Sequence, residues 1–176
     1  MMLEWKRTWV DSEGRKYRNT FYNRTRPGGT NPLTDNPTRA ELLKAIDVWA
    51  PERVLEFGCG YGRILEWIED KYQEVYGCDV SPEMLDLAAD RVACPVFWWD
   101  ILGDDGPEMT WDVSFCRGVF RYFNAEQTAK AMASVSAVTR DAVLVWEWKH
   151  VCDLMRVIAA GRHEKFEFHP IERRDE

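Results

Sequence analysis

Apolar residues recur at two spacings along the chain, and these spacings predict alternating helices and strands. Within residues 38–49, Leu42, Ile46 and Trp49 fall on one side of a helix. The next apolar run, 53–57, is short and predicts a strand. Further helices are expected at 63–72, 82–91, 125–138 and 151–160, and further strands at 74–79, 95–99, 111–116, 142–148 and 165–169.

This alternation predicts an α/β fold with a mainly parallel sheet flanked by helices. Strand 142–148 is almost continuously apolar, as expected for a strand covered on both faces. A chain of 176 residues is long enough to bury a substantial core. We expect a single domain over residues 1–176, in which residues 38–176 form the core and residues 1–37 an N-terminal arm.

The N-terminal arm is rich in basic and aromatic residues. A turn cluster at 11–14 lies between two aromatic-bearing runs and predicts a hairpin, and the Pro- and Gly-rich segment 26–37 predicts a loop. Residues 1–40 contain eight Lys or Arg against four Asp or Glu, whereas residues 41–176 contain fifteen against twenty-six. The arm is either a lid over the open end of the sheet or a strip that contacts RNA, and we expect the lid.

Several classes of protein do not fit the composition. The five cysteines include no CxxC pair and the three histidines show no ligand spacing, so neither a disulfide framework nor a metal site is predicted. No apolar run approaches the ~20 residues of a membrane span, and the N-terminus lacks the apolar stretch of a signal peptide. We expect a soluble, cytoplasmic protein that acts on a small molecule, with no membrane partner; no oligomeric state is indicated.

The segment VLEFGCGYGRIL, residues 54–65, is the most informative part of the chain. A strand leads into Gly58, Gly60 and Gly62 ahead of a helix, which brings backbone N–H groups and the positive helix end together without obstructing side chains. This arrangement predicts a bound polar or anionic ligand. Arg63 stands where the dinucleotide fingerprint has its third glycine, and the chain has no Tyr-x-x-x-Lys pair, so an NAD-dependent oxidoreductase is disfavoured.

The acidic-x-Gly-x-Gly-x-Gly spacing that begins at Glu56 is followed by YGCDVSPEMLDLA at 76–88 and FWWD at 97–100. Together these segments resemble the motifs of the class I S-adenosylmethionine-dependent methyltransferases. The resemblance covers about residues 40–148. It implies S-adenosylmethionine as cofactor, S-adenosylhomocysteine as product, and a Rossmann-like sheet of seven strands whose last strand is antiparallel. The segment after residue 148 is short for two more strands, so we expect a sheet trimmed at its C-terminal edge.

Each acidic residue of these motifs has a ligand-binding interpretation and a structural alternative. Glu56 would attract the α-ammonium group of the cofactor, or would simply be a solvated strand end. Asp79 would accept hydrogen bonds from the ribose hydroxyls, or would cap the following helix, for which Ser81 is better placed. Asp100 would accept from the adenine amine, or would cap its own loop.

Apolar and loop residues complete the expected cofactor site. Val80, Met84 and Ile101 would contact adenine, although helix-to-sheet packing is an alternative for Val80 and Met84. Cys116 and Arg117 would lie beside the methionine end. The full expected set is Glu56, Gly58, Cys59, Gly60, Tyr61, Gly62, Asp79, Val80, Met84, Asp100, Ile101, Cys116 and Arg117. Within it, Cys59 is expected to pack and not to act as a nucleophile, because nothing nearby in sequence supplies a base.

Methyl transfer depends mainly on alignment, and a general base is needed only when the acceptor atom carries a proton. The segment RGVFRYF at 117–123 departs from the Asn/Asp-Pro-Pro-aromatic signature of enzymes that methylate amines in DNA and protein, so a small-molecule acceptor is expected. Candidates that would face the acceptor are Tyr22, Arg121, Tyr122, Glu147 and His150. The alternatives are a non-catalytic methyltransferase-like binding or partner subunit, and an RNA methyltransferase that uses the basic arm.

Overall fold

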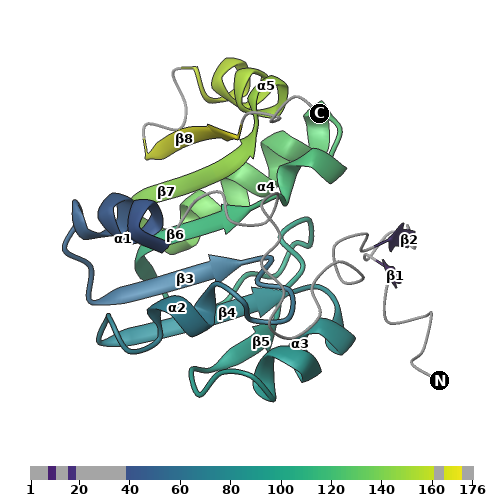
Figure 1. Cartoon of the computed structure of the whole chain (residues 1–176). Coiled ribbons are helices and arrows are strands. Elements are labelled where there is room, and N and C mark those ends of the chain that lie inside the picture. Colours follow the sequence, from purple (N-terminus) through teal and green to yellow (C-terminus); the bar gives the residue numbers. More distant parts are fainter. Residues whose placement is uncertain (1–7, 11–15, 19–38, 161–164, 172–176) are drawn as a thin grey trace, which may run out of the picture.

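The structure is a computed structural model that describes residues 8–10, 16–18, 39–160 and 165–171 (Figure 1). In the arm, β1 (Thr8–Val10) and β2 (Lys16–Arg18) pair antiparallel, with Trp9 opposite Tyr17. This pairing agrees with the predicted hairpin, whose turn lies outside the described residues. The division into arm and core, and the lid function of residues 1–37, remain predictions.

The core alternates strands with helices, as the apolar spacing predicts. Its elements are, in order, α1 (Arg39–Asp47), β3 (Arg53–Phe57), α2 (Leu65–Ile68), β4 (Glu74–Asp79), α3 (Pro82–Ala89), β5 (Val96–Trp98), β6 (Trp111–Arg117), the 3-10 turn η2 (Phe120–Tyr122), α4 (Ala125–Val138), β7 (Thr139–Trp148), α5 (Lys149–Ala159) and β8 (Phe166–Ile171).

The core strands form one sheet in the order β5-β4-β3-β6-β7-β8 (Figure 1). Every neighbouring pair is parallel. The expected α/β fold with a parallel, helix-flanked sheet is therefore confirmed. In the described residues this sheet has six strands and not the seven of the family, in agreement with the expected trimming at the C-terminal edge. The antiparallel last strand that the resemblance implies is not found among them, because β8 follows α5 and enters the sheet beside β7 in the parallel direction.

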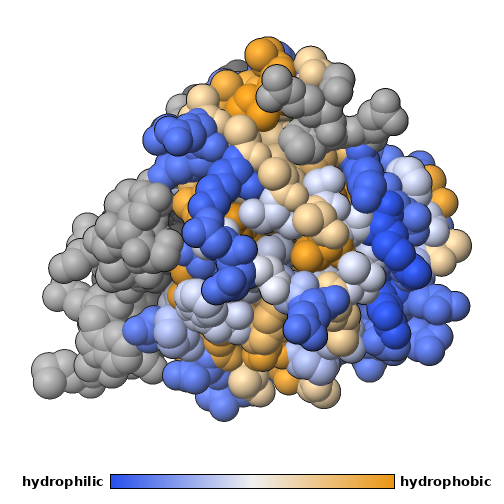
Figure 2. Space-filling view, turned by 180° about the vertical axis from the view of Figure 1, so that it is seen from behind, coloured by the Kyte–Doolittle hydropathy of each residue, from blue (hydrophilic) through white to orange (hydrophobic). Residues whose placement is uncertain are grey.

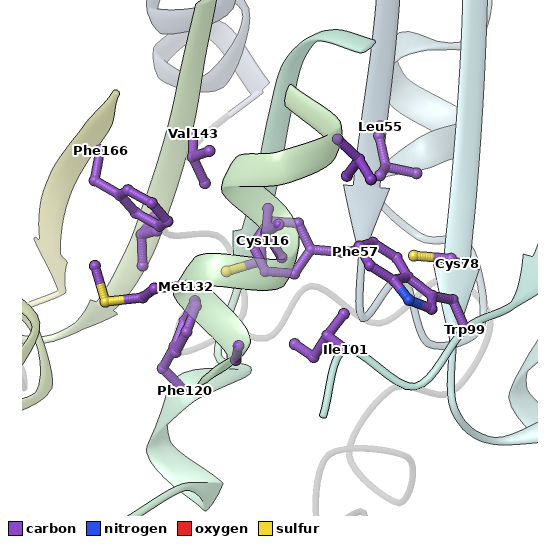
Figure 3. Packing of buried hydrophobic residues seen from close by; sticks show 14 of the residues in the cluster. Leu55, Phe57, Cys78, Trp99, Ile101, Cys116, Phe120, Met132, Val143 and Phe166 are labelled. Atoms are coloured by element: carbon purple, nitrogen blue, oxygen red, sulfur yellow. The ribbon is translucent and has the colours of Figure 1, made fainter. Parts of the chain in front are cut away.

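Successive residues of the central strands point to opposite faces of the sheet, and helices cover both faces. On one face, Leu55 and Phe57 of β3 belong to a buried cluster that includes Met132 of α4 and Met155 of α5. Figure 3 shows this cluster packed between the sheet and α4. The other face is covered by α1 and α2, whose apolar side chains, with those of the intervening sheet, form a second buried cluster. Figure 2, seen from behind Figure 1, shows bands of hydrophilic residues on either side of a paler, more apolar middle.

Helix termini explain why α3 and α4 begin where the sequence predicts. Ser81 caps α3, accepting a hydrogen bond of 3.3 Å from the backbone N–H of Met84. Asn124 and Gln127 form a capping box at α4, with side chain-to-backbone bonds of 2.9 and 3.0 Å. These caps satisfy backbone donors that have no partner within the helix.

The largest difference from the sequence prediction is α2, which was expected over 63–72 and spans only Leu65–Ile68. Before and after it, the backbone N–H groups of Gly62 and Lys71 make the shorter i→i−3 hydrogen bonds, to Cys59 and Ile68. The flanking segments are therefore turns. In addition, β7 begins at Thr139, directly after α4, instead of at residue 142.

All six core strands point the same way, so their carboxyl ends meet at one edge of the sheet. In an open parallel sheet, ligands bind at this edge where neighbouring strands connect in opposite directions. Here that place lies between β3, whose chain continues toward β4, and β6, whose chain continues toward β7. No helix among the described residues is long and apolar enough to cross a membrane.

Candidate active site

A glycine turn leaves the carboxyl end of β3. Gly58, Gly60 and Gly62 have φ angles of +68°, +56° and +77°, a region that favours glycine. A Cβ atom at Gly58 would lie 2.4 Å from Cγ2 of Val119, whereas one at Gly60 would meet nothing within 4 Å. The turn is therefore closely packed at Gly58 and open toward a cavity at Gly60.

Asp79 joins this turn to the end of β4. Its Oδ2 accepts a 2.8 Å hydrogen bond from the backbone N–H of Gly60, and its Oδ1 accepts one of 2.9 Å from Ser81. Each carboxylate oxygen has two lone-pair positions, so backbone donors, which also include Val80, do not use all the acceptor capacity of Asp79. Burial raises the pKa of Asp79, although the backbone donors, Ser81 first, act in the opposite direction. Ser81, and not Asp79, caps α3 through its side chain.

Glu56 lies at the floor of the cavity with only 3% of its surface exposed. Its Oε2 atom is buried and has no hydrogen-bond partner in the described part of the chain. Burial raises the pKa of Glu56 well above its usual value, and Arg63 is the strongest opposing influence. A cationic donor that reached this oxygen would satisfy it and favour the ionised form. The alternative of a solvated strand end does not fit this burial.

The two carboxylate oxygens of Asp100, after β5, have different surroundings. Its Oδ1 accepts a 2.9 Å hydrogen bond from the backbone N–H of Leu102, which is the loop cap foreseen as an alternative. Its Oδ2 is buried and without a partner among the described residues, and Asp100 lines the same cavity. One oxygen therefore serves the loop while the other is left for a donor from a ligand.

These groups surround a cavity of about 200 Å³ at the carboxyl edge of the sheet. Val80, Met84, Ile101 and Leu102 give it an apolar wall beside the acidic residues. The segment after β6 forms the opposite side. The predicted residues that line the cavity are Glu56, Gly58, Cys59, Gly60, Tyr61, Asp79, Val80, Met84, Asp100, Ile101, Arg117, Arg121 and Tyr122.

Two members of the expected cofactor set do not line the cavity. Gly62 packs against α3, where a Cβ atom would lie 3.3 Å from Ala88. Cys116 is fully buried in the cluster between the sheet and α4, and Figure 3 shows it beside Phe57 in that cluster. The structure gives both residues a packing function. Cys59 lies in the turn as a buried thiol whose pKa is raised, mainly by burial, in keeping with packing and not with nucleophilic attack.

The predicted acceptor-facing residues divide in a similar way. Arg121 and Tyr122 line the cavity. Glu147 does not, because it is fully buried behind Arg121. His150 lies exposed in the first turn of α5, away from the cavity wall. Tyr22 lies outside the described residues.

Arg121 and Glu147 form an ion pair on the side of the cavity that follows β6. Nε and Nη2 of Arg121 each lie 3.2 Å from Oε2 of Glu147, and the backbone N–H of Arg121 donates to Oε1 at 3.3 Å. The Arg121 guanidinium also lies 4.9 Å from the ring centre of Trp148. Burial raises the pKa of Glu147, and Arg121 opposes this shift.

Sequence reasoning did not foresee several residues of the cavity wall. They are Arg63, Ile64, Trp99, Leu102, Gly118, Val119 and Phe123. Gly118 has a φ of +76°, and a glycine directly after a predicted strand was the available sequence signal. Within the described ranges, no group of three His, Cys, Asp or Glu side chains is placed to hold a metal ion.

Comparison with known proteins agrees with this arrangement. The chain is 33% identical over 94 residues to a trans-aconitate 2-methyltransferase from Methylobacterium nodulans, a match that covers 51% of this chain and 36% of that protein. Its fold resembles that of an amino pentose methyltransferase from Micromonospora echinaspora solved with bound S-adenosylmethionine, at a TM-score of 0.57 and 23% identity, covering 68% of this chain and 53% of the other. A second similar fold is that of magnesium protoporphyrin IX methyltransferase from Synechocystis PCC 6803, also with bound S-adenosylmethionine, at a TM-score of 0.55 and 17% identity, covering 72% and 69%.

The chain spans only about a third of the length of the trans-aconitate 2-methyltransferase that it matches. A family model described as a methyltransferase domain matches residues 54–142, which is just over half of the chain and includes the glycine turn, Asp79 and Asp100. The chain belongs to this methyltransferase domain family.

Proposed function

We propose that this protein is an S-adenosylmethionine-dependent methyltransferase that transfers a methyl group to a small-molecule acceptor. One observation carries the proposal. Glu56 and Asp100 each have a buried carboxylate oxygen, Oε2 and Oδ2, without a partner among the described residues, and both residues line one cavity together with Asp79 and Gly60. Leaving buried acceptors unsatisfied is costly, so this arrangement favours a ligand that brings donors.

The donors of S-adenosylmethionine fit these acceptors in chemistry and in order along the sheet. Glu56 at β3 would accept from the α-ammonium group. Asp79 at β4 would accept from the ribose hydroxyls through the lone pairs that its backbone bonds leave. Asp100 after β5 would accept from the exocyclic amine of adenine, and Met84 and Ile101 would contact the base.

S-adenosylmethionine, when bound, would supply an electrophilic methyl group. An electron pair of the acceptor would form the new bond to the methyl carbon as the bond from sulfur to that carbon breaks, and S-adenosylhomocysteine would be the product. The residues of the chain contribute mainly alignment and exclusion of water. Burial raises the pKa of Tyr122, so its phenol keeps its proton at neutral pH. The cavity wall includes no histidine among the described residues. These features favour an acceptor that needs little help from a general base.

Two observations support a small molecule as the acceptor. The similar proteins are named for trans-aconitate, an amino pentose and magnesium protoporphyrin IX. The core from residue 41 onward is acidic, with twenty-six acidic against fifteen basic residues, which disfavours a large phosphate-binding surface.

All five cysteines are free thiols, which supports a location in the reducing cytoplasm.

The test combines binding with turnover. Calorimetry measures the affinity of the purified protein for S-adenosylhomocysteine, and mass spectrometry follows transfer of a deuterated methyl group from S-adenosylmethionine to members of a metabolite extract. Nucleotide binding together with a labelled small molecule supports the proposal. Nucleotide binding without any labelled product supports the non-catalytic alternative, and absence of nucleotide binding contradicts both.

A further inference from the structure

The acidic residues of the cavity all lie on one side of it. Glu56 lies near the end of β3, Asp79 ends β4 and Asp100 follows β5, and these strands form one side of the sheet. Arg63, which follows β3, is the basic residue of the cavity wall on this side among the described residues. Arg117 and Arg121 lie at and after the end of β6, on the side that continues to β7. The first side accounts for the donors of the cofactor. The second side is cationic and faces the remaining space, where the acceptor has to lie.

Arg121 is held in one orientation by contacts within the chain. One edge of its guanidinium contacts Glu147 through Nε and Nη2, and the group lies over the ring of Trp148. The guanidinium is therefore held in place both at this edge and by the ring. Only 14% of its side chain is exposed. A guanidinium fixed in this way loses little conformational freedom when it binds a second anion.

Gly118 makes this orientation possible. A Cβ atom at this position would lie 2.8 Å from Nη2 of Arg121 and 3.1 Å from Cζ. The arginine therefore folds back over the end of β6 through space that only glycine leaves open. Its side chain is built into the wall and does not extend into solvent as a surface arginine would.

Glu147 is fully buried and does not line the cavity, so it is not placed to contact a ligand there. Its Oε1 accepts from the backbone of Arg121, and its Oε2 accepts from the Arg121 side chain and from the backbone N–H of Trp148 at 3.2 Å. A guanidinium has five N–H donors, and Nη1 makes none of these contacts. Arg121 thus keeps donor capacity that Glu147 does not use.

We propose that Arg121 binds a carboxylate group of the methyl acceptor, and that Glu147 acts as a positioning residue for Arg121. This inference rests on the proposed methyltransferase function and names the class of its substrate. The planar guanidinium of Arg121 is suited to paired hydrogen bonds with a carboxylate. The acidic residues Glu56, Asp79 and Asp100 line the same cavity and disfavour a dianion such as phosphate.

The test measures binding, so it does not depend on turnover. Ligand-observed NMR compares 3-phenylpropionate and succinate with their neutral amides, and with inorganic phosphate, in the presence of S-adenosylhomocysteine. We expect the carboxylates to bind the wild-type protein and to lose at least about tenfold in affinity in Arg121→Gln. Arg121→Lys, which keeps the positive charge but not the planar set of N–H donors, should retain part of the binding. Gly118→Ala, which displaces the guanidinium without removing it, should weaken the carboxylates in the same way.

Arg156 provides the matched control. It too pairs with an acidic residue, Asp153, and lies over an aromatic ring, Phe168, but it belongs to the outer surface of α5. Arg156→Gln should leave carboxylate binding unchanged. Calorimetry with S-adenosylhomocysteine on every variant separates the two proposals. Wild-type protein that binds no nucleotide contradicts the proposed function. Normal nucleotide binding in Arg121→Gln shows that the variant is folded, so that a loss of carboxylate binding can be assigned to Arg121.

The positioning function of Glu147 has a separate readout. In the wild type, the Nε–H of Arg121 should give a slowly exchanging NMR signal that disappears in Glu147→Gln, with nucleotide affinity retained and carboxylate affinity reduced. Three results would overturn the inference: amides that bind as well as the carboxylates, no carboxylate binding to the wild type, or carboxylate affinity in Arg121→Gln equal to that of the wild type. Phosphate binding that is stronger than carboxylate binding would overturn the assignment of substrate class.

Discussion

The backbone N–H of Gly60 donates a 2.8 Å hydrogen bond to Oδ2 of Asp79, which fastens the glycine turn after β3 to the end of β4. Asp79 thus shapes the turn, and under the proposed function it would also offer acceptors to the cofactor. We expect Asp79→Ala to weaken binding of S-adenosylhomocysteine by about 1.5–3 kcal/mol through lost hydrogen bonds to a charged group. Calorimetry checks this, with Ser81→Ala as the control, since that change removes the α3 cap but leaves Asp79 in place. Equal affinities in the wild type and Asp79→Ala would remove Asp79 from the site.

Glu56 makes the free energy of unfolding depend on pH. Its pKa is raised in the folded protein, so between its ordinary value of 4.5 and its folded value the folded state holds a proton that the unfolded chain has released. The free energy of unfolding therefore falls as pH rises through this range, and the loss persists above it. Chemical denaturation at several pH values should show a weaker decline in Glu56→Gln.

The same Glu56→Gln variant should bind S-adenosylhomocysteine at least about tenfold more weakly, because the charged acceptor for the α-ammonium group is gone. Calorimetry checks this.

The comparison of stabilities also has an internal control. Burial raises the pKa values of Asp79 and Glu147 as well, and both residues are unchanged in the variant, so the difference in pH dependence of the free energy of unfolding between the two proteins isolates Glu56. A pH dependence identical to that of the wild type would show that Glu56 does not carry the effect.

Gly58 and Gly60 should respond differently to alanine, although both have positive φ angles. Gly58→Ala adds a clash with Val119 to the backbone strain, so we expect it to lower the free energy of unfolding by about 2–4 kcal/mol. Gly60→Ala incurs only the strain, about 1 kcal/mol, but its methyl group enters the cavity and should abolish nucleotide binding. Thermal unfolding with and without S-adenosylhomocysteine distinguishes the two, and a larger destabilisation by Gly60→Ala would contradict the packing described.

The cysteines should react slowly in the folded protein. All five have raised pKa values, largely through burial, and that of Cys94 is raised to about 11. Because the thiolate is the reactive form, alkylation by iodoacetamide at neutral pH should be much faster in denaturant than in buffer. Cys94 is the one that is not fully buried, and it should react first. Mass spectrometry of the labelled peptides measures the order, and rapid labelling of Cys59 would argue against its packing function.

Local signals were sufficient for much of the fold. The bounds of α4 could be predicted because its apolar spacing and the Asn124–Gln127 capping box both belong to one short segment. The same holds for β3 and β4, whose bounds match the predicted strands. The length of α2 could not be predicted, because the turns that flank it depend on how the glycine segment packs. The direction of β8 depends on the path of α5 across the sheet, which no spacing of apolar residues encodes.

The site shows the same limit. Glu56, Asp79 and Asp100 were accessible to sequence reasoning because each lies at or near the carboxyl end of a strand. Cys116 was misplaced because its side chain points toward α4, and alternation along β6 decides which residues reach the cavity. Val119 was missed because its importance comes from contact with Gly58, which lies about sixty positions earlier in the chain.

The separation of the cavity between two groups of strands has a consequence for protein engineering. Glu56, Asp79 and Asp100 belong to β3, β4 and the segment after β5, apart in the sheet order from the segment that follows β6 and from the end of β7. Exchange of residues 121–123 together with position 147, with Val119 kept because it packs against Gly58, offers a way to redirect the protein toward new acceptors while the residues proposed to bind the nucleotide stay as they are.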